Sequence, residues 1–291
     1  MPEFKRTISG ALHWGTHLLR AVGVESPRTD AELLLRKALE VNRVEVFLNP
    51  ARPLTRPQFA TYKFLIDKRI KGEPIHYILG GREFWSLGLK VSADVLIPRP
   101  ETELLVEEAL KVFGEGKTRT LRLMEVGTGS GAVAIALAKE LRNCFIVAED
   151  ICWRAVLVAM ENARVHGVLG SIRFLVGDLF GPLKEGTSRF DLIICNPPYI
   201  PSSRIKGLPR EIAEFEPRIA LDGGPDGLQF FRRIVWESGS FLEAGGWLMM
   251  ELGEGQGEAV AHMIRDTGVF ASPHIIGDYS GANRVIRARM G

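Results

Sequence analysis

Four residues that directly follow a short buried-strand pattern point most clearly to chemistry. Phe190 to Cys195 has the apolar pattern of a buried strand, and Asn196-Pro197-Pro198-Tyr199 comes immediately after it. Two consecutive prolines lack the N–H groups that would extend a sheet, so they predict a stiff loop with fixed φ angles. This loop presents mainly hydrogen-bond acceptors, namely the side-chain oxygen of Asn196 and the carbonyl of Pro197.

Such acceptors suit the transfer of a group to a planar amino nitrogen. The lone pair of an amide or aromatic –NH₂ is delocalised, so this nitrogen is a weak nucleophile. Two acceptors that hold its hydrogens orient the lone pair and stabilise the positive charge that develops on nitrogen. Tyr199 is expected to lie against the flat face of the substrate. The alternative is that these four residues form only a turn, since Asn and Pro are common turn residues.

A second motif precedes the first along the chain. An apolar strand pattern over residues 121–126 runs into a glycine-rich turn and then into a helical pattern. The glycines let the backbone approach a ligand where a Cβ atom would collide. A strand, a glycine turn and a helix together predict a nucleotide-type site at the carboxyl edge of a parallel sheet. The turn consists of Gly127, Thr128, Gly129, Ser130 and Gly131.

The next strand pattern, over residues 144–148, is followed by Glu149 and Asp150. An acid at this position accepts the hydrogens of both ribose hydroxyls, as it does for adenosylmethionine and for NAD. The alternative is that Asp150 caps the following helix. The glycine turn favours the ribose role, so the two features predict a ligand that contains adenosine. The loop at Asn196 then favours S-adenosylmethionine, because NAD leaves that loop unexplained.

The elements that must position these residues differ along the chain. Residues 1–72 show helical periodicity, with a capping box expected at Thr29 to Glu32 and a helix stop at Gly72. Residues 73–99 form a strand-rich connector, expected to be a β-hairpin that turns near Ser86-Leu87-Gly88. A helix is expected to open at Pro100, since proline suits the first turn.

From residue 100 to residue 291 strand and helix patterns alternate. Strands are expected near 121–126, 144–148, 172–176, 190–195, 246–252 and 283–288, and helices near 131–142, 152–166, 227–243 and 255–267. This alternation predicts an α/β domain whose mainly parallel sheet is covered on both faces.

Composition narrows the class of protein. The 291 residues contain 37 Lys and Arg against 35 Asp and Glu, which argues against a strongly basic nucleic-acid surface. Residues 1–80 are mildly basic, with 13 Lys and Arg against 8 Asp and Glu.

The three cysteines form no C-x-x-C pair, which argues against a zinc site or a disulfide framework. Without a signal-peptide or membrane-span pattern, we expect a cytoplasmic protein without metal.

Beyond these motifs, nearly the whole chain resembles the release-factor glutamine N5-methyltransferases, the HemK/PrmC type. The similarity is carried by Asn196 to Tyr199 and by further segments, which are Gly72-Glu73-Pro74, Tyr77 to Gly80, Phe84, Leu96 to Glu103, Gly177 to Phe180, Glu216-Pro217 with Ala220-Leu221, Gly223-Gly224 with Asp226 to Leu228, Glu251 to Gly253 with Gln256-Gly257, and Asp278-Tyr279 with Gly281 and Asn283-Arg284.

The resemblance implies a seven-stranded, Rossmann-like class I methyltransferase domain after a small helical bundle that docks the protein substrate. It implies S-adenosylmethionine as cofactor and the glutamine of a Gly-Gly-Gln loop in class-1 peptide-chain release factors as target. The glycine turn and Asp150 are expected to hold the cofactor, and Asp178-Leu179 to border its adenine. Glu125 stands where the family usually has Asp, and Asn283 stands at a position where Asp is common in the family. The role of Arg99 stays open between the cofactor carboxylate and the connector.

Four other functions are alternatives. A nucleic-acid amino methyltransferase acting on adenine N6 or guanine N2 would use the same loop, but it would need a basic groove and room for a flipped base. Methylation of a glutamine in a ribosomal protein would use the same catalytic residues. An NAD oxidoreductase or a binding module without catalysis leaves Asn196 and Tyr199 without a role.

Overall fold

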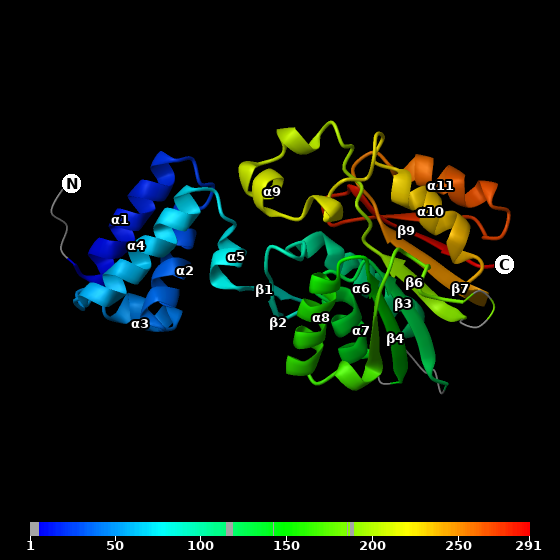
Figure 1. Cartoon of the computed structure of the whole chain (residues 1–291), viewed down its shortest axis with the longest axis horizontal. Coiled ribbons are helices and arrows are strands. Elements are labelled where there is room, and N and C mark those ends of the chain that lie inside the picture. The colour runs from blue at the N-terminus through cyan, green and yellow to red at the C-terminus, as the bar shows by residue number, and fades with distance from the viewer. Residues whose placement is uncertain (1–5, 115–118, 142, 185, 187–188) are drawn as a thin grey trace. The chain divides into compact units, whose positions relative to one another are not determined.

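A computed structural model describes residues 6–114, 119–141, 143–184, 186 and 189–291, and the chain divides into two compact units (Figure 1). The first unit comprises the chain up to Gly80 together with residues 210–215. The second comprises residues 81–209 and 216–291.

The first unit is helical, as predicted. Its helices are α1 (Ile8–Ala21), α2 (Pro27–Leu39), α3 (Arg43–Leu48), α4 (Arg56–Ile70), α5 (Ile75–Leu79) and, from the distant segment, α9 (Arg210–Phe215). Apolar faces of these helices form a separate core that includes Leu19, Leu34, Tyr62 and Ile66. Arg69 joins α9 to this unit, because its guanidinium binds Asp30 at 2.8 Å and Glu211 at 2.6 Å.

The capping box expected at Thr29 is wrong. Helix α2 already begins at Pro27, so Thr29 lies within its first turn, and Ser26 at the N-cap makes no side-chain cap bond. Proline fits the first helical position without losing a hydrogen bond, which explains the earlier start. Capping boxes occur instead at the starts of α3 and α4, formed by Asn42 with Glu45 and by Thr55 with Gln58.

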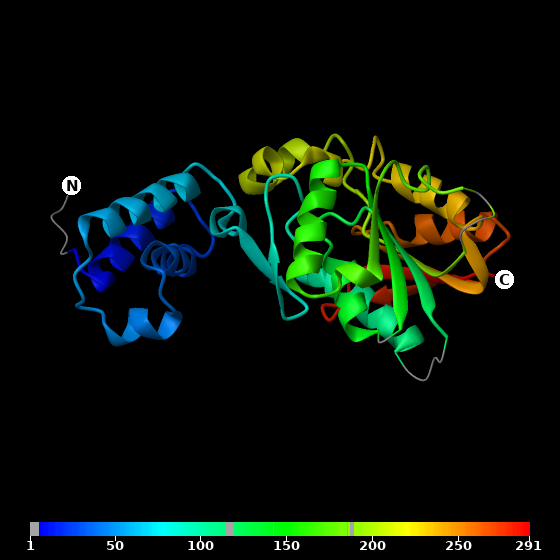
Figure 2. The same cartoon turned by 60° about the horizontal axis from the view of Figure 1, so that its bottom comes forward.

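The connector differs from the prediction in its first residues and in its turn. Residues 75–79 form α5, and the hairpin follows as β1 (Gly81–Phe84) and β2 (Leu87–Lys90), beside α8 (Figure 2). The turn expected at Ser86 to Gly88 lies at Trp85-Ser86, whose φ angles are 51° and 56°. Positive φ at both central residues is the geometry of tight hairpin turns, which usually select Asn and Gly, so this sequence gave no such signal.

The second unit contains the predicted sheet with seven strands, in the order β5-β4-β3-β6-β7-β9-β8. The strands are β3 (Leu121–Val126), β4 (Cys144–Asp150), β5 (Ile172–Val176), β6 (Phe190–Cys195), β7 (Leu242–Glu251), β8 (His274–Gly277) and β9 (Asn283–Arg289). Neighbours from β5 to β7 pair in parallel, whereas β9 is antiparallel to both β7 and β8. The short edge strand β8 was not predicted.

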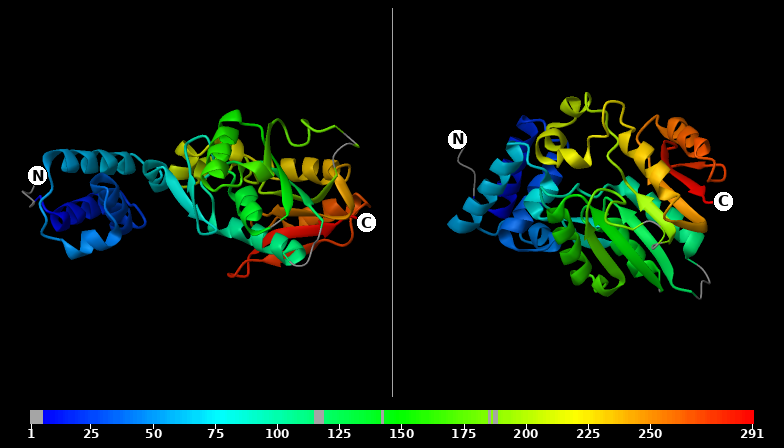
Figure 3. Two further views of the ribbon diagram at one scale, coloured as in Figure 1. Left: turned by 90° about the horizontal axis from the view of Figure 1, so that it is seen from below. Right: turned by 45° about the vertical axis from the view of Figure 1, so that its right-hand side comes forward.

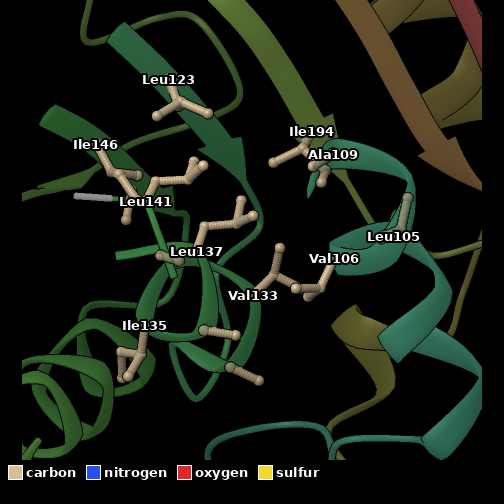
Figure 4. Packing of buried hydrophobic residues seen from close by; sticks show 14 of the residues in the cluster. Leu105, Val106, Ala109, Leu123, Val133, Ile135, Leu137, Leu141, Ile146 and Ile194 are labelled. Carbon is tan, nitrogen blue, oxygen red and sulfur yellow. The ribbon is translucent and has the colours of Figure 1, made fainter. Parts of the chain in front are cut away.

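Helices cover both faces of this sheet (Figure 3). The helices of the second unit are η1 (Pro100–Thr102), α6 (Glu103–Phe113), α7 (Ala132–Glu140), α8 (Trp153–Val165), η2 (Leu169–Ser171), η3 (Ile205–Gly207), η4 (Arg218–Ala220), α10 (Gln229–Ser238) and α11 (Gly257–Asp266). Helices α6 and α7 pack on one face, where Val106, Val133 and Ile194 meet (Figure 4). Helices α10 and α11 pack on the other.

Strand alternation distributes β6 between the two cores. Leu192 and Ile194 belong to the core under α6 and α7, whereas Ile193 and Cys195 belong to the core under α10 and α11. Burial on both faces explains the continuous apolar run of this strand. The helix expected over 227–243 is shorter, because Leu242 already begins β7. Among the described residues, no helix is long and apolar enough to cross a membrane.

Candidate active site

A pocket of about 1110 Å³, measured to its open mouth, lies in the second unit where β3, β4 and β6 end. Ten of the twelve residues predicted for the site line it, namely Gly127, Thr128, Gly129, Ser130, Asp150, Asp178, Leu179, Asn196, Pro197 and Pro198. Gly131 and Tyr199 are not among the lining residues. The two motifs, which are about 70 residues apart in sequence, therefore face one cavity.

The glycine turn has the conformation that its composition predicts. Gly127, Gly129 and Gly131 have φ angles of 72°, 54° and 81°, a region that other residues adopt only with strain. A Cβ atom on Gly127 or Gly129 would meet no protein atom within 4 Å, so at both positions the space beside the backbone is open. Gly131 also permits close packing, because its Cβ would lie 3.1 Å from the Cβ of Ala159 on α8, and its contact with a cofactor stays a prediction.

Asp150 ends β4 and holds the glycine turn. Its Oδ2 accepts a hydrogen bond from the Gly129 N–H at 2.8 Å, and its Oδ1 accepts one from the Cys152 N–H at 2.8 Å. Burial raises the pKa of this carboxyl group, while both backbone bonds lower it. The N-cap of α8 is Cys152, so Asp150 does not cap that helix. The carboxylate can accept further bonds, since its two oxygens offer about four acceptor sites.

Two buried glutamates lie beneath the turn. Glu125 accepts hydrogen bonds from the Thr128 hydroxyl at 2.5 Å and from the Ala134 N–H at 3.2 Å. Desolvation raises the pKa of Glu125 to about 8, and the same effect with the nearby Asp150 charge raises the pKa of Glu149 to about 8. Glu125 lines the pocket, where it offers an acceptor to a cationic group. In the described part of the chain, no group of three His, Cys, Asp or Glu residues is arranged to hold a metal.

Asn196 directly follows β6, and a hydrogen bond fixes the orientation of its side chain. Its Nδ2 donates a hydrogen bond to the hydroxyl of Thr102 at 3.1 Å. Because the amide nitrogen is committed to Thr102, Oδ1 remains the acceptor that Asn196 offers to a ligand. Pro197 is buried in the same pocket wall and has no N–H, so its backbone contributes only a carbonyl.

Tyr199 contacts the core of the second unit, and its expected contact with the flat face of a substrate stays a prediction. Its ring packs against the core under α10 and α11, and its hydroxyl donates to Glu251 Oε1 at 3.3 Å. Burial, followed by the Glu251 charge, raises the pKa of this phenol. The backbone carbonyl of Tyr199 accepts from Gln256 Nε2 at 2.9 Å. A Cβ on Gly223 would lie 2.8 Å from the Pro198 carbonyl oxygen, which explains this glycine under the loop.

Asp178 and Leu179 line the pocket after β5. Both carboxylate oxygens of Asp178 accept bonds from Arg233 of α10, each at 3.0 Å. The pair is partly exposed, with 36% of the Arg233 side chain and 50% of the Asp178 side chain accessible, so its own stabilisation is small. It nevertheless fixes the loop beside Leu179, which is buried and has a φ angle of 53°.

Arg99 braces the segment that precedes η1. Its guanidinium forms a short ion pair with Glu216, whose side chain is 1% exposed, and Glu216 also accepts from the Ile97 N–H at 3.3 Å. Of the two roles left open for Arg99, the structure shows the bracing of the connector. Arg99 also lines the pocket, so contact with a ligand stays a prediction.

Sequence reasoning missed four residues that support the site: Thr102, Glu149, Glu251 and Gln256. Thr102 and Glu251 lie in segments that carried the family resemblance, but no local pattern showed that they contact each other. Their hydrogen bond joins residues 149 positions apart. Only the packing of α6, which directly follows Thr102, against β7 could have indicated it.

Family models match both parts of the chain. Residues 10–80 match the PrmC N-terminal domain, and residues 101–208 match the methyltransferase small domain. A human methyltransferase 10 domain containing protein superposes with a TM-score of 0.53 at 19% identity, covering 70% of this chain and 88% of that one. At this identity the similarity supports the class I methyltransferase fold alone.

Curated relatives are similar over almost their full length. A release factor glutamine methyltransferase of Geobacter sulfurreducens is 42% identical over 98% of this chain and 97% of its own length. One of Moorella thermoacetica is 38% identical over 97% of this chain and 98% of its own length. Both identity and coverage extend through the helical unit as well as the sheet. The chain therefore belongs to the release factor glutamine methyltransferase family.

Proposed function

We propose that this chain transfers a methyl group from S-adenosylmethionine to the side-chain amide nitrogen of a glutamine, the one in the Gly-Gly-Gln loop of class-1 peptide-chain release factors. One observation carries the proposal: Asn196 and Pro197 line the same pocket as the glycine turn and Asp150. A protein that only bound adenosine would have no use for the loop at Asn196.

The residues of the pocket fit this cofactor. Open space beside Gly127 and Gly129 admits a ligand against the backbone, and Asp150 offers carboxylate oxygens for ribose hydroxyls. Glu125 suits the amino group of the cofactor's methionine part, and Leu179 suits the edge of its adenine. When bound, the cofactor supplies an electrophilic methyl group on a sulfonium.

The protein's own residues then act on the glutamine amide. Asn196 Oδ1 and the Pro197 carbonyl oxygen accept its two N–H hydrogens, which turns the nitrogen lone pair toward the methyl group. Transfer would form the N–C bond and break the S–CH₃ bond of the sulfonium, leaving S-adenosylhomocysteine, and both acceptors would stabilise the positive charge that develops on nitrogen. One N–H proton would then pass to water, so the pocket requires no strong base.

Residues 1–72 are proposed to dock the release factor. The helical unit has a core of its own, and the residues of the two chemical motifs lie in the other unit. Its mild positive charge, counted over residues 1–80, suits a partner with acidic segments.

Tandem mass spectrometry of a class-1 release factor, incubated with the purified chain and isotope-labelled S-adenosylmethionine, tests the proposal. We expect one labelled methyl group on the side-chain amide of the Gly-Gly-Gln glutamine. A release factor in which this glutamine is replaced by asparagine is the control and should remain unlabelled. Label on a ribosomal protein or on RNA, with none on the factor, would contradict the proposal.

A further inference from the structure

One buried carboxylate holds both polar side chains of the Asn196–Tyr199 loop. Glu251 is the last residue of β7, adjacent to the end of β6, and is 1% exposed. Its Oε2 accepts the Thr102 hydroxyl at 2.6 Å, and its Oε1 accepts the Tyr199 hydroxyl at 3.3 Å. Thr102 in turn accepts from Asn196 Nδ2 at 3.1 Å. Glu251 therefore contacts Tyr199 directly and Asn196 through Thr102.

The direction of each hydrogen bond in this chain follows from the groups themselves. Above the pKa of Glu251, which burial raises to about 7, its ionised carboxylate has only acceptors, so the single hydroxyl hydrogen of Thr102 points to Glu251. The Thr102 oxygen can then only accept from Asn196. An acceptor at that place binds the –NH₂ end of the Asn196 amide and excludes its oxygen end. With the amide in this orientation, Oδ1 is the end that remains for a ligand.

We propose that Thr102 and Glu251 are positioning residues, which keep the Asn196 amide in the orientation that presents Oδ1 to the substrate. The inference rests on the proposed function, since it names the residues that make Asn196 an acceptor for the glutamine amide. In the opposite orientation Asn196 would direct two N–H donors at the substrate –NH₂, and donor would face donor. Both positioning residues are buried, at 5% and 1% exposure, which limits the access of water to the bond between them.

The location of Thr102 explains why this bond can be rigid. Thr102 is the last residue of η1, and α6 begins at the next residue. Its backbone is fixed by the Arg99 carbonyl, which accepts its N–H at 3.1 Å. Arg99 itself is paired with Glu216. The hydroxyl is therefore presented from a braced helix start, and small movements of the loop at Asn196 do not displace it.

Thr102→Val tests the inference, because valine keeps the shape of threonine and removes its hydroxyl. Initial rates on a whole release factor should give a kcat about 10- to 100-fold lower, with little change in the affinity for S-adenosylhomocysteine. Thr102→Ser restores a hydroxyl and should recover most of the rate. Thr267→Val is the matched control: it removes another threonine hydroxyl, partly buried and bonded to the Ile264 carbonyl at the end of α11 outside the pocket, and should leave kcat unchanged.

A double-mutant cycle separates positioning from general damage. In the Asn196→Ala background Thr102→Val should cause little further loss, because the amide that Thr102 orients is already absent. Radiolabelled methyl transfer in single-turnover reactions measures the residual rates. If Thr102→Val does not fold, Glu251→Gln takes its place, since an amide can donate to Thr102 and reverse the chain. The Glu251→Gln variant should also have a lower kcat and retain the affinity for S-adenosylhomocysteine.

The outcomes distinguish this inference from the proposed function. If the wild-type chain transfers no methyl group to the glutamine, the proposed function fails. If the wild type is active and Thr102→Val and Glu251→Gln both retain its kcat, the positioning role fails while the function stands. Full additivity of Thr102→Val with Asn196→Ala would also overturn the positioning role. A loss in Thr102→Val that is restored by Thr102→Ser and absent in the Asn196→Ala background supports it.

Discussion

The backbone N–H of Gly129 donates a hydrogen bond to Asp150 Oδ2 at 2.8 Å. This contact ties the turn after β3 to the residue that ends β4, so one carboxylate both shapes the turn and borders the pocket. We therefore expect a change at Asp150 to affect cofactor binding more than the chemical step.

Asp150→Ala should weaken the binding of S-adenosylhomocysteine by about 10-fold or more, since hydrogen bonds to a charged acceptor are lost and the turn loses its anchor. Isothermal titration calorimetry measures the affinity. Asp266→Ala, which removes an exposed carboxylate on α11, is the control and should bind normally. Unchanged affinity in Asp150→Ala would exclude the ribose role.

Gly129→Ala should also weaken cofactor binding. At a φ angle of 54° an L-residue costs roughly 1–2 kcal/mol, and the new methyl group enters the space that the ligand needs. Gly268→Ala is a matched control, because Gly268 has a φ of 69° and equally open surroundings after α11. Both variants should lose similar stability in urea unfolding, and only Gly129→Ala should lose affinity. If Gly129→Ala and Gly268→Ala bind S-adenosylhomocysteine equally well, the proposed approach of the cofactor to the backbone of the glycine turn is wrong.

The stability of the ligand-free protein should fall as pH rises from about 5 to about 8. Burial raises the pKa values of Glu125 and Glu149 to about 8 and that of Glu251 to about 7. The folded protein then binds more protons than the unfolded chain in this window, so the free energy of unfolding decreases with pH. Aspartates with lowered pKa values, such as Asp226, change the free energy of unfolding only at lower pH. Urea midpoints measured across the range test this.

Glu149→Gln provides the comparison for the pH effect. It removes one titrating group, and its curve of unfolding free energy against pH should be flatter than that of the wild type. If the free energy of unfolding of the wild type instead rises between pH 5 and pH 8, burial in the fold does not raise the pKa values of these carboxyl groups.

Removal of residues 1–80 should leave cofactor affinity nearly intact and lower kcat/KM on a whole release factor. The pocket is formed by the second unit, whereas docking is assigned to the first. A short Gly-Gly-Gln peptide should be methylated equally slowly by both forms. If the shortened chain methylates the intact factor as well as the full chain does, the division of roles is wrong.

The sequence predicted the parts of the fold that depend on local pattern. Six strands were placed within a few residues, because buried parallel strands such as β6 leave an uninterrupted apolar run. β8 was missed, since its four residues at a sheet edge carry too little pattern. The segment 210–215 was not expected to join the helical unit, because the Arg69–Glu211 pair that holds it spans 142 positions in the sequence.

Of the candidate site, too, the sequence predicted the parts that depend on local pattern. Glycine and proline reveal backbone requirements locally, so the turn at Gly127 and the loop at Asn196 could be recognised. The buried contacts of Tyr199 with Glu251 could not, because they depend on the pairing of β6 with β7. The glycine pattern also could not show that Gly131 lies against Ala159, because this contact depends on the packing of α7 on α8.

The rate of glutamine methylation by Asn196→Ala tests the central claim most directly. Loss of one preorganised acceptor should lower kcat by about 10²- to 10³-fold while the affinity for S-adenosylhomocysteine stays close to that of the wild type. Asn196→Asp keeps an acceptor but adds a charge beside the sulfonium, which stabilises the ground state as well, and should recover only part of the rate. Near-normal turnover by Asn196→Ala on a release factor would contradict the account and reduce the loop to a turn.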